Sequence, residues 1–234
     1  MSTFRGPART SFPAAALVLA FATFLLCGSE ARAQEPAPVR YGLTMGLNMG
    51  KFIWPETWMA DLGRDDRLPQ PSMRYGWVAE FFPTNPSISI VTGVDYRMTA
   101  EKYHIYVEGA GLWTERMGTF LTVPVLFRYT LLNKVNGPWP FFELGPQAAF
   151  LLSMTGKDDG SGATAPSPSM EMTQYNRRVT MELRGGTGIE FPMSRMFTAV
   201  IEAGYEYALT STTEESLNLP VKVRNLFFTM GARF

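Results

Sequence analysis

The chain has 234 residues, 46% of them hydrophobic, and its 21 basic residues balance its 21 acidic ones. This balance gives no net positive charge of the kind expected of a nucleic-acid-binding protein. One cysteine and one histidine are too few for a zinc site, and we expect no cofactor or metal.

The N-terminal segment has the pattern of a secretory signal peptide. Arg5 and Arg9 supply the positive region, an apolar run occupies residues 12–27, and Ala31-Arg32-Ala33 is a small-x-small cleavage site. We expect cleavage after Ala33, so that residues 1–33 are the signal and 34–234 form one domain. A retained membrane anchor is disfavoured because the apolar run is short for a spanning helix. The hypothesis of lipid attachment at Cys27 is weaker still, because lipoprotein sites have a small residue just before the cysteine and this chain has Leu26 there.

The mature chain is predicted to carry no disulfide and no spanning helix. Removing residues 1–33 takes away the only cysteine and leaves 18 basic and 20 acidic residues, a net charge of −2. No later stretch approaches the roughly 20 apolar residues that a spanning helix needs. A membrane span must therefore be made of strands.

Eight segments alternate apolar residues with small, polar or charged ones, which predicts eight strands. In chain order they cover about residues 39–50, 72–82, 87–99, 119–132, 140–153, 179–191, 197–209 and 225–234. In the last segment the apolar parity continues to the terminal Phe234. A chain that ends within a strand suits a closed barrel, in which the last strand pairs with the first.

The spacers between these segments alternate in length. Residues 83–86, 133–139 and 192–195 form short spacers, whereas 51–71, 100–118, 154–178 and 210–221 form longer, polar ones. Outer-membrane barrels have short periplasmic turns, longer extracellular loops and an even number of strands. We therefore predict an all-β fold, an eight-stranded antiparallel transmembrane barrel with the long spacers outside the cell.

Charged residues fall on the small-residue parity of the predicted strands. They are Arg74, Glu80, Asp95, Arg97, Arg128, Glu143, Glu182, Arg184, Glu190, Glu202, Glu206 and Arg233. A secreted or periplasmic β-sandwich also alternates and is the main rival. The glycines of the charged parity and the aromatic residues near the ends of the apolar parity favour the barrel. An eight-stranded barrel is just wide enough for side chains to fill, so we expect these charges to pair inside it.

No catalytic site is expected. His104 is the only histidine, and no pattern links a serine and an acid to it. Asp158 and Asp159 are too few ligands for a calcium cage. Trp54 and Trp58, in the first long spacer, are expected to anchor that loop at the membrane interface. The alternative for these two residues is a patch that contacts a partner.

Several motifs resemble the outer-membrane β-barrel domain family that includes PorT-like proteins. They are YGLTMGLN at residues 41–48, SIVTGVDY at 89–96, FLTVPVLFRY at 120–129, FELGPQAAFLL at 142–152, GGTGIEF at 185–191 and FTMGARF at 228–234. Arg128 stands where the family strand L-x-I-P-L-L-x-K-Y has lysine. The resemblance implies an eight-stranded outer-membrane barrel, and some members assist protein secretion. It also implies that Phe234 is the terminal aromatic signal for the barrel-assembly machinery.

We therefore expect a non-enzymatic barrel of the outer membrane that contacts membrane lipid and, through its loops, envelope or secretion partners. The first alternative is narrow, porin-like transport of small solutes. The second is an enzyme acting on envelope lipids.

Overall fold

The computed structural model describes residues 39–53, 68–83, 85–107, 110–131, 137–160, 170–171, 173, 176–194, 197–213 and 221–234. The predicted signal peptide, with its cleavage site after Ala33, lies outside these residues, as do Trp54 and Trp58. Within the described part of the chain, no helix combines the length and hydropathy of a membrane span.

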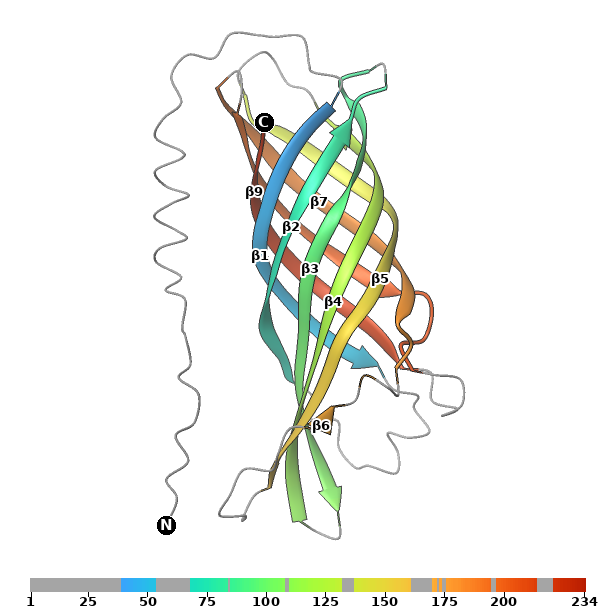
Figure 1. The fold of residues 1–234 in the computed structure, drawn as a ribbon. Helices are drawn as coiled ribbons and strands as arrows, with labels where there is room; N and C mark the ends of the chain where they lie inside the picture. Colours follow the sequence, from blue (N-terminus) through green and yellow to red (C-terminus); the bar gives the residue numbers. More distant parts are fainter. Residues whose placement is uncertain are drawn as a thin grey trace, which may run out of the picture.

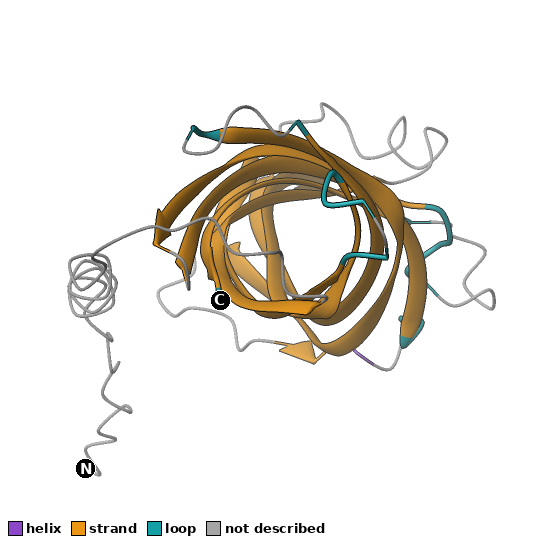
Figure 2. Ribbon diagram, turned by 90° about the horizontal axis from the view of Figure 1, so that it is seen from above, coloured by secondary structure: helices purple, strands orange, loops and turns teal. Residues whose placement is uncertain are grey.

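Eight antiparallel strands close into a barrel, as the alternating segments predict (Figures 1 and 2). They are β1 (Val39–Ile53), β2 (Leu68–Phe81), β3 (Ile88–Val107), β4 (Ala110–Thr130), β5 (Trp139–Gly160), β7 (Val179–Ser194), β8 (Phe197–Ala208) and β9 (Lys222–Arg233). Each pairs with its neighbour in the chain, and the two-residue β6 (Met170–Glu171) pairs with β5 beside the ring.

Pairing of the first and last strands closes the ring. The register of β1 and β9 runs from Gly42 opposite Arg233 to Ile53 opposite Lys222. Tyr41 donates its backbone N–H to the carbonyl of Phe234 at 3.0 Å, and the N–H of Phe234 donates in return at 2.8 Å. The backbone of the terminal residue therefore continues the β1–β9 ladder.

The two parities of the strands form two different surfaces. Large apolar side chains lie on the outside, with Leu43 and Leu226 each 56% exposed. Aromatic rings stack on this outer face, Tyr41 against Trp77 at 5.7 Å and Tyr75 against Tyr96 at 4.8 Å between ring centroids. An apolar outer band with aromatic residues suits contact with lipid.

Three strands continue further than their sequence indicates. β3, β4 and β5 have 20, 21 and 22 residues, whereas the other barrel strands have 12 to 16. About 9–11 residues cross a bilayer. The far ends of the three strands project below the ring in Figure 1, opposite the end that holds the C-terminus. We call residues 103–107, 110–118 and 154–160 the β3–β5 extension.

The prediction that residues 100–118 and the start of 154–178 form loops was therefore wrong. The alternation disappears here because charges occupy both parities, as in Glu101-Lys102 and Glu115-Arg116. The strands nevertheless stay paired, with Lys102 opposite Glu115 and Glu115 opposite Lys157. Outside a bilayer neither face must be apolar, so sequence periodicity is lost while the backbone ladder continues.

Glycines make room for large side chains inside the ring. A Cβ atom at Gly204 would lie 2.4 Å from Cζ of Phe227, and one at Gly188 would lie 2.4 Å from Cζ of Phe141. Both phenylalanines are buried. The glycine-rich parity therefore lets aromatic rings and arginines share a narrow interior.

Candidate functional site

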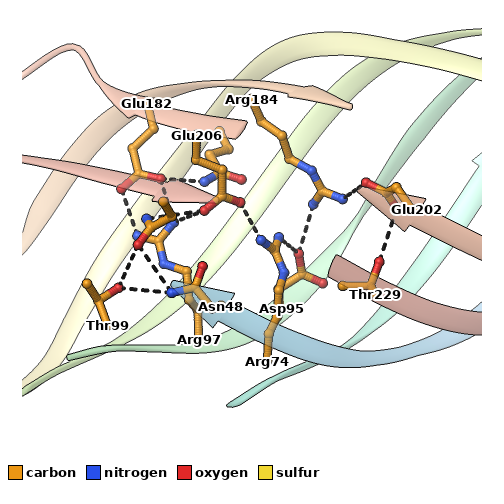
Figure 3. A network of polar contacts seen from close by, with 12 residues as sticks. Asn48, Arg74, Asp95, Arg97, Thr99, Glu182, Arg184, Glu202, Glu206 and Thr229 are labelled. Atoms are coloured by element: carbon orange, nitrogen blue, oxygen red, sulfur yellow. Dashed lines mark hydrogen bonds and ion pairs between the residues drawn. The ribbon is translucent and has the colours of Figure 1, made fainter. Parts of the chain in front are cut away.

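The interior of the barrel is filled by charged side chains. The structure buries all twelve charged residues of the small-residue parity. They are Arg74, Glu80, Asp95, Arg97, Arg128, Glu143, Glu182, Arg184, Glu190, Glu202, Glu206 and Arg233. They form three connected groups along the barrel. We call them the short-turn, middle and far groups, in order of their distance from the short turns between the strands. Figure 3 shows most residues of the middle and far groups.

Arg128 is the centre of the short-turn group. It donates to Glu143 on the adjacent β5 at 2.6 Å and to Glu190 on β7 at 2.9 Å. Arg40 of β1 joins the same group, at 3.0 Å from Glu80 and 3.3 Å from Glu190. Five strands (β1, β2, β4, β5 and β7) therefore meet in one set of charge-assisted hydrogen bonds, which are stronger than neutral ones.

The middle group crosses the lumen from β7 to β3. Arg184 of β7 donates to Glu202 on β8 at 2.6 Å and to Asp95 on β3 at 3.0 Å. Arg74 of β2 binds the same Asp95, and donates to Glu206 of β8 at 2.5 Å (Figure 3). Because β3 and β7 are not neighbours in the ring, these contacts span the interior.

The far group contains a second pair that spans the lumen. Arg97 of β3 donates to both carboxylate oxygens of Glu182 on β7, each at 2.8 Å. Arg97 also binds Glu206, and Gln147 donates to Glu182. Asn225 donates to Glu206 at 3.3 Å. Paired in this way, the buried charges avoid the several kcal/mol that an isolated one costs.

Inward-facing phenylalanines cover the flat faces of the arginines. The Arg128 guanidinium lies 4.0 Å from the ring centroid of Phe141. Arg74 and Arg184 lie on Phe227 at 4.6 and 4.7 Å. Cation–π contacts of this kind strengthen when water is excluded. The phenylalanine rings and the paired charges therefore fill the interior of the barrel together.

An apolar cluster occupies the lumen at the end where β1 finishes. Its members are Phe52, Phe120, Ala149, Leu151, Met154, Ala208, Val221 and Val223. Arg116 lies against it, with its guanidinium 4.6 Å from the ring centroid of Phe52. It donates to the sulfur of Met154 at 2.9 Å and to Asn176 at 3.1 Å. We call this set the apolar plug.

Some interior residues were not identified from the sequence as part of the charged network. Arg40, Gln147 and Asn225 all join it, and Arg116 lies against the apolar plug. A usable signal existed, since each continues the inward parity of its strand. The sequence does not indicate which residues these side chains pair with, because pairing across the lumen depends on the stagger of distant strands.

The described residues offer little for other chemistry. None of them form a group of three or more His, Cys, Asp or Glu placed to hold a metal ion. His104 lies on β3 within the β3–β5 extension, and Asp158 and Asp159 lie on the extended end of β5. What the interior arrangement can do is hold the wall together and obstruct the passage.

Comparison with known proteins points to a barrel family. Residues 32–214 match the family model described as outer membrane protein beta-barrel domain. Among curated proteins nothing matches. The chain is similar to Ail, the attachment invasion locus protein of Yersinia pestis, at 15% identity over 85% of this chain and 100% of that one, with a TM-score of 0.39.

Two further solved barrels are similar at the same distant level. OprG from Pseudomonas aeruginosa is 9% identical over 88% of this chain and 98% of its own, with a TM-score of 0.45. Neisserial surface protein A is 13% identical over 82% and 95%, with a TM-score of 0.37. These likenesses are too distant to indicate what the chain does.

Proposed function

This chain belongs to the outer membrane protein beta-barrel domain family, and from that premise we propose that it is a non-enzymatic structural barrel. Its wall is held by the charged interior, and it acts on other envelope components through its extracellular end. Membrane lipid surrounds the apolar outer band, whose large side chains are exposed in the isolated chain.

The observation that carries this proposal is the obstruction of the lumen. Ion pairs such as Arg97–Glu182 cross it, and the apolar plug follows towards the far end. Eight-stranded barrels have interiors that side chains can fill. A filled lumen supports a structural or contact role over bulk transport.

The β3–β5 extension supports the contact role. It carries three paired strands beyond the ring (Figure 1), at the end that is extracellular in an outer-membrane barrel. Paired strands would offer a partner in the envelope a continuous surface beyond the ring. Trp54 and Trp58 would add to this surface if they form a partner patch, and would only anchor a loop in the membrane otherwise.

Narrow transport of small solutes is the second candidate. Buried polar atoms without a hydrogen-bond partner among the described residues favour it, notably Nε of Arg40 and both Nε and Nη1 of Arg233. Both arginines pair with Glu80 of the short-turn group, Arg40 at 3.0 Å and Arg233 at 3.8 Å, and water would satisfy their remaining N–H groups. The apolar plug opposes a continuous water path, so this candidate ranks lower.

The proposal also includes two finer roles that the sequence resemblance implies. A PorT-like role beside secretion partners would follow from the sequence resemblance, as would recognition of Phe234 by the barrel-assembly machinery. An enzyme acting on envelope lipids is the least supported reading, because the charged residues inside the barrel are engaged with one another.

Affinity capture from native envelopes tests the contact role. The full chain is compared with a variant in which residues 103–114 are replaced by a two-residue Asn-Gly turn, which joins the register partners Lys102 and Glu115 and keeps the β3–β4 register of the ring. We expect specific envelope proteins with the full chain and their loss with the variant. A heat-dependent shift on SDS gels, retained in both proteins, shows that the ring still folds. Equal capture by both would reject the extension as the contact surface.

The double variant Trp54→Ala/Trp58→Ala separates the two roles of the first long spacer. Lost capture with an unchanged melting temperature supports a partner patch. A lower melting temperature with unchanged capture supports the membrane anchor.

A further inference from the structure

A row of basic side chains ends the lipid-facing surface of β1, β9 and β8. The outward rows in register are Met45–Met230–Ile201, Leu47–Phe228–Ala203 and Met49–Leu226–Tyr205. The next row is Lys51–Arg224–Tyr207, and Lys222 follows opposite Ile53. We call Lys51, Lys222 and Arg224 the basic row. It lies where the apolar band stops, at the end of the barrel opposite the short turns.

Tyr207 gathers two of these cations. Nζ of Lys222 lies 5.4 Å from its ring centroid, and the guanidinium carbon of Arg224 lies 5.3 Å from it. Lys51 stands directly across the β1–β9 ladder from Arg224, and both are exposed. Two positive charges therefore lie at one aromatic ring, and the third stands across the ladder from one of them.

The basic row has no ion pair to an acidic residue in the described part of the chain. Every arginine of the charged interior is in an ion pair, by contrast. On the other side of the barrel, the outward lysines are interleaved with acid: Glu115 of β4 stands opposite both Lys102 and Lys157. Among the described strand residues, the outward cations of β9 and β1 therefore differ from those of β3 and β5, which stand opposite an acid.

An anion at this row would relieve the repulsion between its charges. Like charges directly opposite each other on neighbouring strands destabilise the pair, which applies to Lys51 and Arg224. A cation on the lipid-facing surface is tolerated near the interface, where its long stem reaches the headgroups. Arginine suits phosphate through its planar donors, and lysine adds point charge.

We propose that the basic row binds the phosphate groups of a phosphorylated lipid in the extracellular leaflet, with Tyr207 as the ring that positions Lys222 and Arg224. Two features favour this lipid: its negative charge complements the basic row, and its phosphates would lie at the depth of the row in the membrane. The row is at headgroup level, and the apolar rows of β1, β9 and β8 below it would receive the acyl chains of the same lipid molecule. This inference depends on the membrane placement and is independent of whether the lumen conducts.

The test uses the mature barrel in nanodiscs of neutral phosphatidylcholine. The discs contain a few mole per cent of either a diphosphorylated lipid A or the same glycolipid without phosphates, and native mass spectrometry counts retained molecules. We expect the wild type to prefer the phosphorylated form. The variant Lys51→Gln/Lys222→Gln/Arg224→Gln should lose about fivefold of that preference per cation removed.

The matched control is Lys102→Gln/Lys157→Gln, which removes two outward lysines from the opposite side and should keep the preference. Heat-modifiable migration on gels verifies that all variants are folded. Equal retention of both lipids by the wild type, or an unchanged preference in the triple variant, would overturn the proposal. So would an equal loss in the control, which would indicate net charge alone. If inorganic phosphate displaced the phosphorylated lipid at an equal concentration of phosphate groups, the proposal that the row binds a lipid would be overturned.

Discussion

Arg97 and Glu182 hold opposite walls of the barrel together, through two hydrogen bonds of 2.8 Å between strands that are not neighbours in the ring. Both side chains are buried. A bidentate pair of this kind fixes direction as well as distance. The pair therefore acts as a brace that connects β3 to β7 across the lumen, and its contribution to stability can be measured.

Arg97→Met is expected to lower the free energy of unfolding by about 3–5 kcal/mol, because Glu182 and Glu206 remain buried with a partner removed. Urea titration of the barrel in lipid vesicles, followed by tryptophan fluorescence, measures it. Adding Glu182→Gln should recover part of the loss. The control is Arg178→Met, at an exposed position, which should change stability by less than about 0.5 kcal/mol. Equal effects of Arg97→Met and the control would contradict the brace.

Gly204→Ala is expected to destabilise the barrel by about 1–3 kcal/mol, since the added Cβ would lie 2.4 Å from Phe227 and 2.5 Å from the carbonyl oxygen of Gly185. Gly185→Ala is the matched control on the outward parity, where the nearest atom is 3.3 Å away, on Leu144. Thermal unfolding in detergent compares the two. If both substitutions were tolerated equally, the interior would be looser than this packing requires.

Phe234→Ala is expected to reduce the amount of barrel assembled in cells, with little effect on the stability of the refolded protein. The closing hydrogen bonds with Tyr41 are made by the backbone and survive the substitution, and the side chain is 54% exposed. The control is Leu226→Ala, at an exposed apolar residue of β9. Quantitative membrane fractionation and refolding yield separate the two effects. Normal assembly of Phe234→Ala in cells would remove the assembly role.

The alternating parity allowed most of the ring to be predicted. Segments such as residues 197–209 carry apolar residues on every second position, and β8 occupies nearly the same residues. Alternation works here because one face meets lipid and the other a crowded interior. The same reasoning failed for the β3–β5 extension, where Glu115 and Arg116 put charge on both faces.

The contacts inside the ring were beyond sequence reasoning for a different reason. Parity indicates that Arg184 points inward, but its partner Asp95 is 89 residues away on a strand that is not adjacent. The stagger of the closed sheet decides which side chains share a level. Phe227 belongs to the same inward parity, and nothing in its neighbours along the chain indicates that it contacts both Arg74 and Arg184.

Single-channel recording in planar bilayers tests the obstructed lumen most directly. Purified wild-type barrel should give no large, steady openings, because cross-lumen pairs such as Arg97–Glu182 and the apolar plug fill the passage. A variant that removes interior bulk, Phe52→Ala/Arg97→Ala/Phe120→Ala, should conduct if it folds, as judged by its heat-dependent gel shift. Large, steady, ion-conducting openings from the pure wild-type protein would contradict the account.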